Sequence, residues 1–238
     1  MSGPAGETPG NPGNPVKGDG RRLRWAHHRA ERRNGFVQAG VAAVDLHGPG
    51  ASAEQVASAA GVSRTVLYRY FRDKDDLRQA VADEIVEQIM GSVLPHLTLD
   101  AESTPREVIT STIGTIIGLF ADHPNYYLFL RDQRTGSLGT VESTLADRVA
   151  VLLQGLMMFF GLDGDEAQPG AYGLVGFVES SCAWWLVRRD QPGALSRERF
   201  TATICTAVWH MLEGVARANG VTVHYDEPLP FAALTEAR

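Results

Sequence analysis

Apolar side chains recur every third or fourth position through most of the chain, the spacing of helices that bury one face. The most regular stretch is an apolar ridge with a period of four residues, formed by Leu77, Val81, Ile85, Ile89 and Val93. No segment alternates in the way that indicates a strand. Together with capping residues and Gly or Pro stops, the pattern predicts an all-α protein with about nine helices, over residues 25–47, 53–60, 64–71, 74–94, 106–121, 125–131, 141–160, 171–189 and 196–218.

Residues 52–71 carry the capping signals of two short helices joined by a tight turn. Ser52 suits an N-cap, and Gln55 three residues later completes a capping box. Gly61 can adopt the left-handed conformation that ends a helix, and Ser63 can cap the next one. The segment therefore reads as a helix-turn-helix.

The second of these helices has two distinct faces. Leu67 and Phe71 lie four residues apart on the face expected to be buried. The opposite face carries Arg64, Thr65, Tyr68, Arg69 and Arg72. Such a helix fits a DNA major groove, whereas the alternative is an ordinary helical hairpin with a solvated basic face.

The segment Gly61–Phe71, followed by Asp73–Leu77, resembles the recognition helix and the start of the fourth helix of the TetR family of transcriptional regulators. The resemblance spans about residues 32–93. Near the first helix the chain departs from the family pattern, with Val44 where phenylalanine is usual, Gly40 inside the helix and a short loop at 48–50. The resemblance implies a homodimer that binds double-stranded operator DNA, most often as a repressor, and is released by a small molecule.

Charge is distributed unevenly along the chain. Residues 21–74 hold ten Lys and Arg against four Asp and Glu, whereas residues 75–238 hold eleven against twenty-two, within a net charge of −6. This asymmetry indicates a DNA-facing module on an acidic body. We expect a disordered tail at 1–20, a DNA-binding domain at 21–74, an effector-binding and dimerisation domain at 75–220 and a C-terminal tail at 221–238.

The predicted DNA contacts concentrate on the second helix of the motif. Arg64 and Arg69 can donate to guanine or phosphate, and Thr65 can contact a base edge. Lys74 resembles the family lysine that touches phosphate, and Tyr70 either donates to phosphate or packs in the core. The full predicted set is Ser52, Ser63, Arg64, Thr65, Val66, Tyr68, Arg69, Tyr70 and Lys74. The basic segment at 21–29 is either an arm that reaches DNA or the solvated start of the first helix, with Trp25 packed on the body.

Two further sets fall in the body. Small residues form a stripe on the last two helices, which the family uses for dimerisation, although simple intrachain packing is the alternative. This stripe comprises Gly173, Gly176, Ser180, Ala183, Ala202 and Thr206. An excess of aromatic and sulfur side chains, with a few polar groups, predicts a cavity for an apolar effector, aromatic or acyl in character. Its candidate residues are His123, Tyr127, Met157, Phe160, Phe177, Trp184, Trp185 and His210, each of which plain core packing could also explain. We expect helix 74–94 to transmit the effector signal to the DNA-binding domain.

Several function classes are disfavoured. The chain lacks a phosphate-binding glycine loop, a nucleophile elbow and a metal-binding histidine pattern, so we expect no catalysis, cofactor or metal. No apolar run is long enough to span a membrane, no secretory signal is visible, and we expect a cytoplasmic protein. Cys182 and Cys205 suit a reducing compartment and should be buried thiols on neighbouring helices, with a redox pair as the alternative.

The alternatives in function are an activator of the same fold, an architectural DNA-binding protein, and a ligand-binding helical protein with little specific DNA binding.

Overall fold

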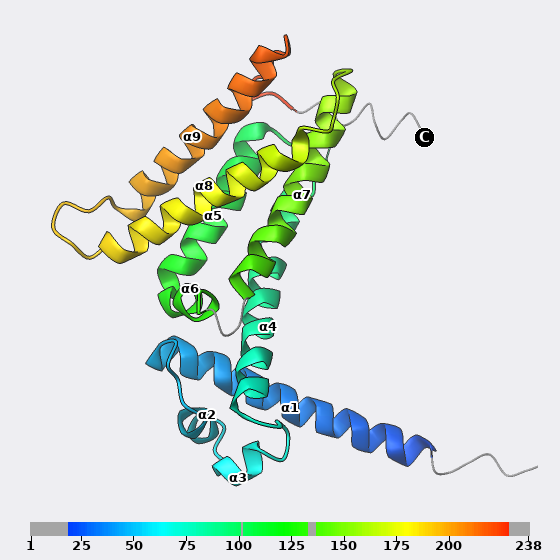
Figure 1. Cartoon of the computed structure of the whole chain (residues 1–238), viewed down its shortest axis with the longest axis vertical. Coiled ribbons are helices and arrows are strands. Elements are labelled where there is room, and N and C mark those ends of the chain that lie inside the picture. The colour runs from blue at the N-terminus through cyan, green and yellow to red at the C-terminus, as the bar shows by residue number, and fades with distance from the viewer. Residues whose placement is uncertain (1–18, 101, 133–136, 229–238) are drawn as a thin grey trace, which may run out of the picture.

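The computed structural model describes residues 19–100, 102–132 and 137–228, with side chains described from Arg24 onward. Over these residues the chain forms nine α-helices, one short 3-10 helix and no strand, so the all-α prediction is confirmed (Figure 1). The elements are α1 (Asp19–His47), α2 (Ala53–Ala59), α3 (Arg64–Leu67), α4 (Lys74–Val93), η1 (Leu94–Leu97), α5 (Pro105–Asp122), α6 (Pro124–Leu130), α7 (Ser137–Phe159), α8 (Ala167–Arg188) and α9 (Arg197–Ala218). None of the helices within the described ranges is long and apolar enough to cross a membrane.

The first three helices form a head at one end of the molecule, and α4 runs from this head into a body made by the later helices (Figure 1). The capping box of α2 is present. The backbone N–H of Gln55 donates to Ser52 Oγ at 3.2 Å, and the backbone N–H of Ser52 donates to Gln55 Oε1 at 2.7 Å. Gly61 has a φ of +66°, as its place in the turn requires.

The recognition helix α3 is shorter than predicted. It is α-helical only over Arg64–Leu67, and the next residues tighten into i→i−3 hydrogen bonds, from the Arg69 amide to Val66 O and from the Tyr70 amide to Leu67 O. Ser63 stands at the N-cap without a side-chain hydrogen bond, which also differs from the prediction. The tightening lets the chain bury Phe71 and turn at once into α4, whose cap Asp73 accepts from the Asp76 amide at 2.8 Å.

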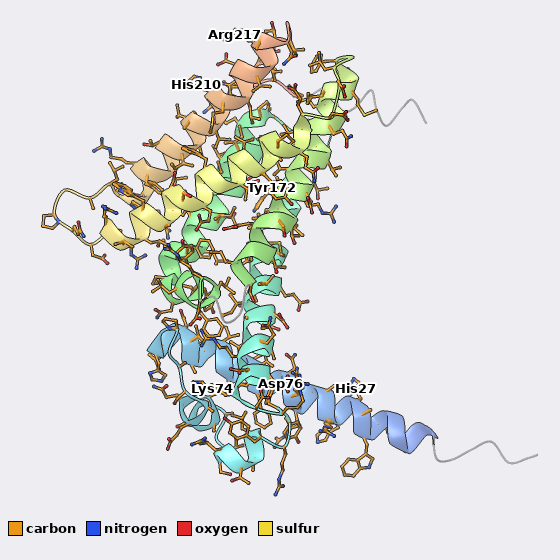
Figure 2. All side chains as sticks on the ribbon, in the orientation of Figure 1. His27, Lys74, Asp76, Tyr172, His210 and Arg217 are labelled. Atoms are coloured by element: carbon orange, nitrogen blue, oxygen red, sulfur yellow. The ribbon has the colours of Figure 1, made fainter. Side chains whose placement is uncertain are left out.

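Helix α1 begins at Asp19, earlier than predicted, so the last two residues of the expected tail are already helical. The other predicted tail residues, 1–18, lie outside the described residues. The N-terminal half of α1 projects away from the head (Figure 1), with His27 on this projecting part (Figure 2). Trp25 is 71% exposed, so the expectation that it packs on the body is wrong.

Gly40 lies where α1 crosses α4. A β-carbon at this position would collide with a Val81 methyl group, whereas a β-carbon at Gly35 on the same helix would meet nothing within 4 Å. The glycine that looks like an interruption in the sequence is thus the point of closest approach between the two helices.

Replacing Gly40 by alanine should therefore lower the free energy of unfolding by about 1–3 kcal/mol, because the stiff Val81 side chain must move. Gly35→Ala is the matched control and should raise stability by about 0.5–1 kcal/mol through helix propensity. Urea unfolding of both variants measures the difference. Equal stabilities would show that the α1–α4 contact relaxes without cost.

Two apolar cores fill the molecule. The first runs from the head along α4 into α6 and α7, and it buries the whole predicted ridge of α4. The second joins α5, α8 and α9, and it holds Cys182 and Cys205 as buried free thiols, as predicted. Part of the expected C-terminal tail is ordered on this second core, with the Tyr225 ring against Trp209 at 4.7 Å between centroids. The capping box of α5 is also confirmed, between Thr104 and Glu107.

Helices α7 and α8 begin earlier than predicted. The expected loop around residues 136–139 is helical from Ser137 on, and the expected acidic loop at 161–170 is helical from Ala167 on. Glycine marked the first loop in the sequence, and glycine with proline marked the second, but helix starts tolerate both residue types.

Candidate DNA-binding face and effector cavity

The outer face of α3 presents the predicted contacts to solvent. Arg64, Thr65 and Arg69 are exposed, and Val66 and Tyr68 are half-buried. The Arg64 guanidinium lies over the Tyr68 ring at 5.8 Å from its centroid, so the two side chains form one donor surface. Beneath them Leu67 is fully buried, which fixes the orientation of this short helix.

The remaining predicted contacts frame this face. Lys74 is exposed as the first residue of α4, beside the head (Figure 2). Tyr70 packs edge-on against Phe36 at 5.0 Å, which supports the core-packing alternative for its ring. Ser52 is occupied by the capping box of α2, and Ser63 is exposed.

The basic segment at 21–29 is helical, and its last residue reaches the head. Arg29 donates to the Arg69 carbonyl oxygen at 3.3 Å, which links the projecting part of α1 to the end of α3. The segment therefore forms the start of the first helix, as one of the two alternatives predicted. A contact between this segment and DNA stays a prediction.

The body holds a cavity of about 1010 Å³ that is partly open to solvent and is bounded by the end of α4 and by α5, α6, α7, α8 and α9. It lies between the two cores, since Ile89 and Tyr127 of the first core and Ile109 and Trp209 of the second all line it. Most of its wall is aliphatic, with a run of Leu and Val from α7. Such a volume suits a small organic ligand.

Only part of the predicted ligand set lines this cavity. Tyr127, Met157 and Phe160 do, whereas His123, Phe177, Trp184, Trp185 and His210 do not.

The five predicted residues that do not line the cavity make contacts elsewhere. Trp185 stacks on Phe200 at 5.0 Å in the second core, where Phe177 also packs, and Trp184 is 50% exposed. His210 lies on the outer side of α9 (Figure 2), where its Nδ1 is 3.2 Å from a Glu213 oxygen.

His123 lies at the junction of head and body. Its Nδ1 is 3.0 Å from the Asp45 carboxylate on α1, and its ring stacks on Tyr126. Next to it, the Asn125 amide donates to the Asp45 carbonyl oxygen at 2.7 Å. His123, which was predicted to bind the effector, therefore lies outside the cavity.

The polar groups of the cavity gather around one tyrosine. The Tyr127 hydroxyl donates to Glu179 Oε1 at 2.7 Å, and burial followed by this hydrogen bond raises the pKa of Tyr127. Burial, and then the nearby Glu179 charge, also raise the pKa of Glu142, which lines the same cavity. The sequence gave no signal for Glu142.

A second link between head and body is Arg78 on α4, which sequence reasoning missed. Its guanidinium donates to the Pro49 carbonyl oxygen at 2.9 Å and to Asp132 at 3.0 Å, and it lies over the Phe129 ring at 4.2 Å. Pro49 belongs to the head, and the other two partners belong to α6 and the residues after it.

The small-residue stripe of α8 and α9 is largely uncovered. Gly173, Gly176, Ser180, Ala202 and Thr206 are exposed, and Ala183 is half-buried. Large apolar side chains on the same helices are exposed as well, namely Tyr172, Trp184, Val187, Met211 and Val215. A surface of this composition is suited to pairing with another protein surface.

No group of three or more His, Cys, Asp or Glu that could hold a metal ion is found in the described ranges.

Comparison with known proteins gives concordant matches. Residues 36–81 match the sequence profile described as bacterial regulatory proteins, tetR family. An uncharacterised HTH-type transcriptional regulator of Mycobacterium tuberculosis strain H37Rv is 32% identical over 212 residues, covering 86% of this chain and 87% of that protein. Among solved structures, a tetR-family regulator from Streptomyces coelicolor aligns with a TM-score of 0.61 at 16% identity, over 78% of this chain and 84% of that one. The regulator FadR from Bacillus subtilis, in complex with stearoyl-CoA, aligns with a TM-score of 0.59 at 16% identity, over 76% and 97%.

Proposed function

Because this chain belongs to the TetR family of transcriptional regulators, which are not enzymes, we propose that it represses transcription as a homodimer on a palindromic operator until a small apolar effector enters its cavity. The observation that carries this proposal is the continuity of the first core. It joins Leu67 of the recognition helix, through the ridge of α4, to Tyr127 at the cavity wall. A ligand that repacks the wall can therefore shift the head.

The dimer follows from the size of the head. A four-residue helix offers only a few base contacts, and a twofold pair reading half-sites about 34–36 Å apart multiplies them. The exposed small-residue stripe supports α8 and α9 as the surfaces that pair, because small side chains let helices approach closely.

The apolar effector is supported by the aliphatic wall and the volume of the cavity. FadR from Bacillus subtilis, a neighbour in fold, binds stearoyl-CoA, which agrees with a body of this shape holding an apolar chain. Effector release needs little energy, since a hundredfold loss of operator affinity corresponds to about 2.7 kcal/mol of coupling.

Two routes can carry this coupling. One is the α4 ridge, and the other is α6, which bears Tyr127 on the cavity side and contacts α1 through Asn125 on the other. Both α4 and α6 end on the head. Movement of either helix therefore changes the spacing between the recognition helices of the two subunits in the dimer.

Selection of duplex DNA from a random pool by the purified protein tests the proposal. We expect an enriched inverted repeat and a protein that sediments as a dimer at micromolar concentration. An operator that overlaps a promoter would indicate repression, and one upstream would indicate activation. A monomer, or steep salt dependence without any enriched sequence, would contradict the proposal and favour an architectural or ligand-binding protein.

A further inference from the structure

The charges in the cavity wall all have one sign. Glu142, Glu166, Glu179 and Glu213 line it, and the described lining residues include no Lys, Arg or His. Glu213 is already paired with Arg217 at 2.7 Å, and Glu166 is exposed. The two carboxylates left to act inside the cavity are Glu142 and Glu179.

These two carboxylates differ in their hydrogen bonds. Glu179 accepts from the Tyr127 hydroxyl at 2.7 Å on one oxygen and from the Ser180 hydroxyl at 3.3 Å on the other, so both of its oxygens already have a donor. Glu142 is half-buried and accepts no hydrogen bond from any described residue, nor does it form an ion pair with one. Its raised pKa reflects the same situation, a carboxyl group in an apolar wall next to a second negative charge.

A second wall group also lacks a partner. The hydroxyl oxygen of Thr112 on α5 is fully buried and makes no hydrogen bond within the described part of the chain. The rings of Phe120 and Tyr127 also line the cavity and pack edge to face at 5.5 Å, and the Arg131 guanidinium, which does not line the cavity, lies 5.9 Å from the centroid of the Tyr127 ring. Carboxylates beside aromatic rings form a favourable environment for a cationic nitrogen.

We propose that the effector is a cationic amphiphile, with an apolar body against the aliphatic wall and a protonated amine or quaternary ammonium between Glu142, Glu179 and the Tyr127 ring. This inference rests on the proposed function of the cavity as the effector site. An ammonium group supplies the counter-charge that Glu142 lacks, whereas a carboxylate or phosphate ligand adds negative charge to a wall that already carries it. Desolvated charge pairs of this kind discriminate strongly between ligands of opposite sign.

Four probes with one apolar chain and different head groups test the inference on the full chain: dodecylamine, dodecyltrimethylammonium, dodecanoate and dodecanol. Each is titrated below its micelle concentration, with the fluorescence of Trp209 in the cavity wall and calorimetry as readouts. We expect both cations to bind at least about tenfold more tightly than dodecanol, and dodecanoate to bind more weakly than dodecanol.

Glu142→Gln and Glu179→Gln keep the side-chain shape and remove the charge. Each should weaken binding of the cations about tenfold and leave dodecanol unchanged, whereas Glu102→Gln, an exposed position outside the cavity, should change neither. Dodecanoate binding as tightly as dodecylamine would overturn the inference, as would unchanged cation binding in both cavity variants.

Operator release, measured in parallel, separates this inference from the proposed function. Cations that bind through Glu142 without releasing DNA would support the inference and contradict the effector role of the cavity. Release by dodecanol or dodecanoate, with no effect of the cations, would support the effector role and overturn the inference.

Discussion

Replacing both Arg64 and Tyr68 by alanine should lower affinity for the selected operator by about thirtyfold or more, because each side chain that contacts DNA contributes about 1–3 kcal/mol. Arg64 is exposed, and its guanidinium lies over the Tyr68 ring, so the pair presents donors and an aromatic face at the surface of the head. The double variant should also lose most of the difference between operator and unrelated DNA. Fluorescence anisotropy with both duplexes measures the two effects together.

Lys74→Ala is the matched control. Lys74 is exposed at the first position of α4, where a phosphate contact is sequence-independent. This variant should weaken binding to all duplexes alike and reduce the salt slope by about one. If both variants lose affinity equally on every sequence, the assignment of base contacts to α3 is wrong. A melting temperature close to that of the parent protein establishes that the head is intact.

The head could be predicted almost completely because its signals are local. The capping box at Ser52 and the left-handed Gly61 each depend on side chains within one or two turns, and the ridge of α4 repeats an apolar residue every fourth position. The length of α3 could not be predicted in the same way. It ends at Leu67 because Phe71 must reach the core and α4 must start at Lys74, and both demands come from tertiary packing.

The sequence predicted a cavity in the body, but it did not predict most of the residues that line it. Aromatic side chains were taken as its lining, yet Trp185 and Phe200 fill the second core by stacking on each other. The actual wall is mainly aliphatic, with Leu152 and Leu156 of α7 among its residues. Aliphatic runs look alike whether they face a core or a cavity, so the periodicity of the sequence does not separate the two cases.

Arg78 could have been found from the sequence. Helical spacing places it on the same side of α4 as Ala82, Ile85 and Ile89, all of which are buried. A charged residue on a buried face requires partners, and those partners mark a junction. Arg78 is the one charged side chain among the buried residues of α4, and the neighbouring apolar ridge masks it in the sequence pattern.

Arg78→Ala should lower the free energy of unfolding by about 3 kcal/mol, the low end for loss of one partner of a buried pair. The Arg78 side chain is 7% exposed and its partner Asp132 is 24% exposed, so water relieves part of the loss. The change also removes the donor to Pro49 and the cation over Phe129. Thermal unfolding should show a melting temperature lower by about 6–12 °C for a chain of this size.

The control is Arg72→Ala, because Arg72 is 86% exposed and pairs with Asp76 on the surface, where ion pairs contribute about 1 kcal/mol or less. Arg78 also joins the head to the end of α6, so its loss should leave operator binding in place while weakening operator release by the effector. Arg78→Met retains the apolar contact with Phe129 and separates charge from volume. If Arg78→Ala is no less stable than Arg72→Ala, and release is unchanged, the junction carries neither stability nor signal, and coupling must run through the α4 ridge alone.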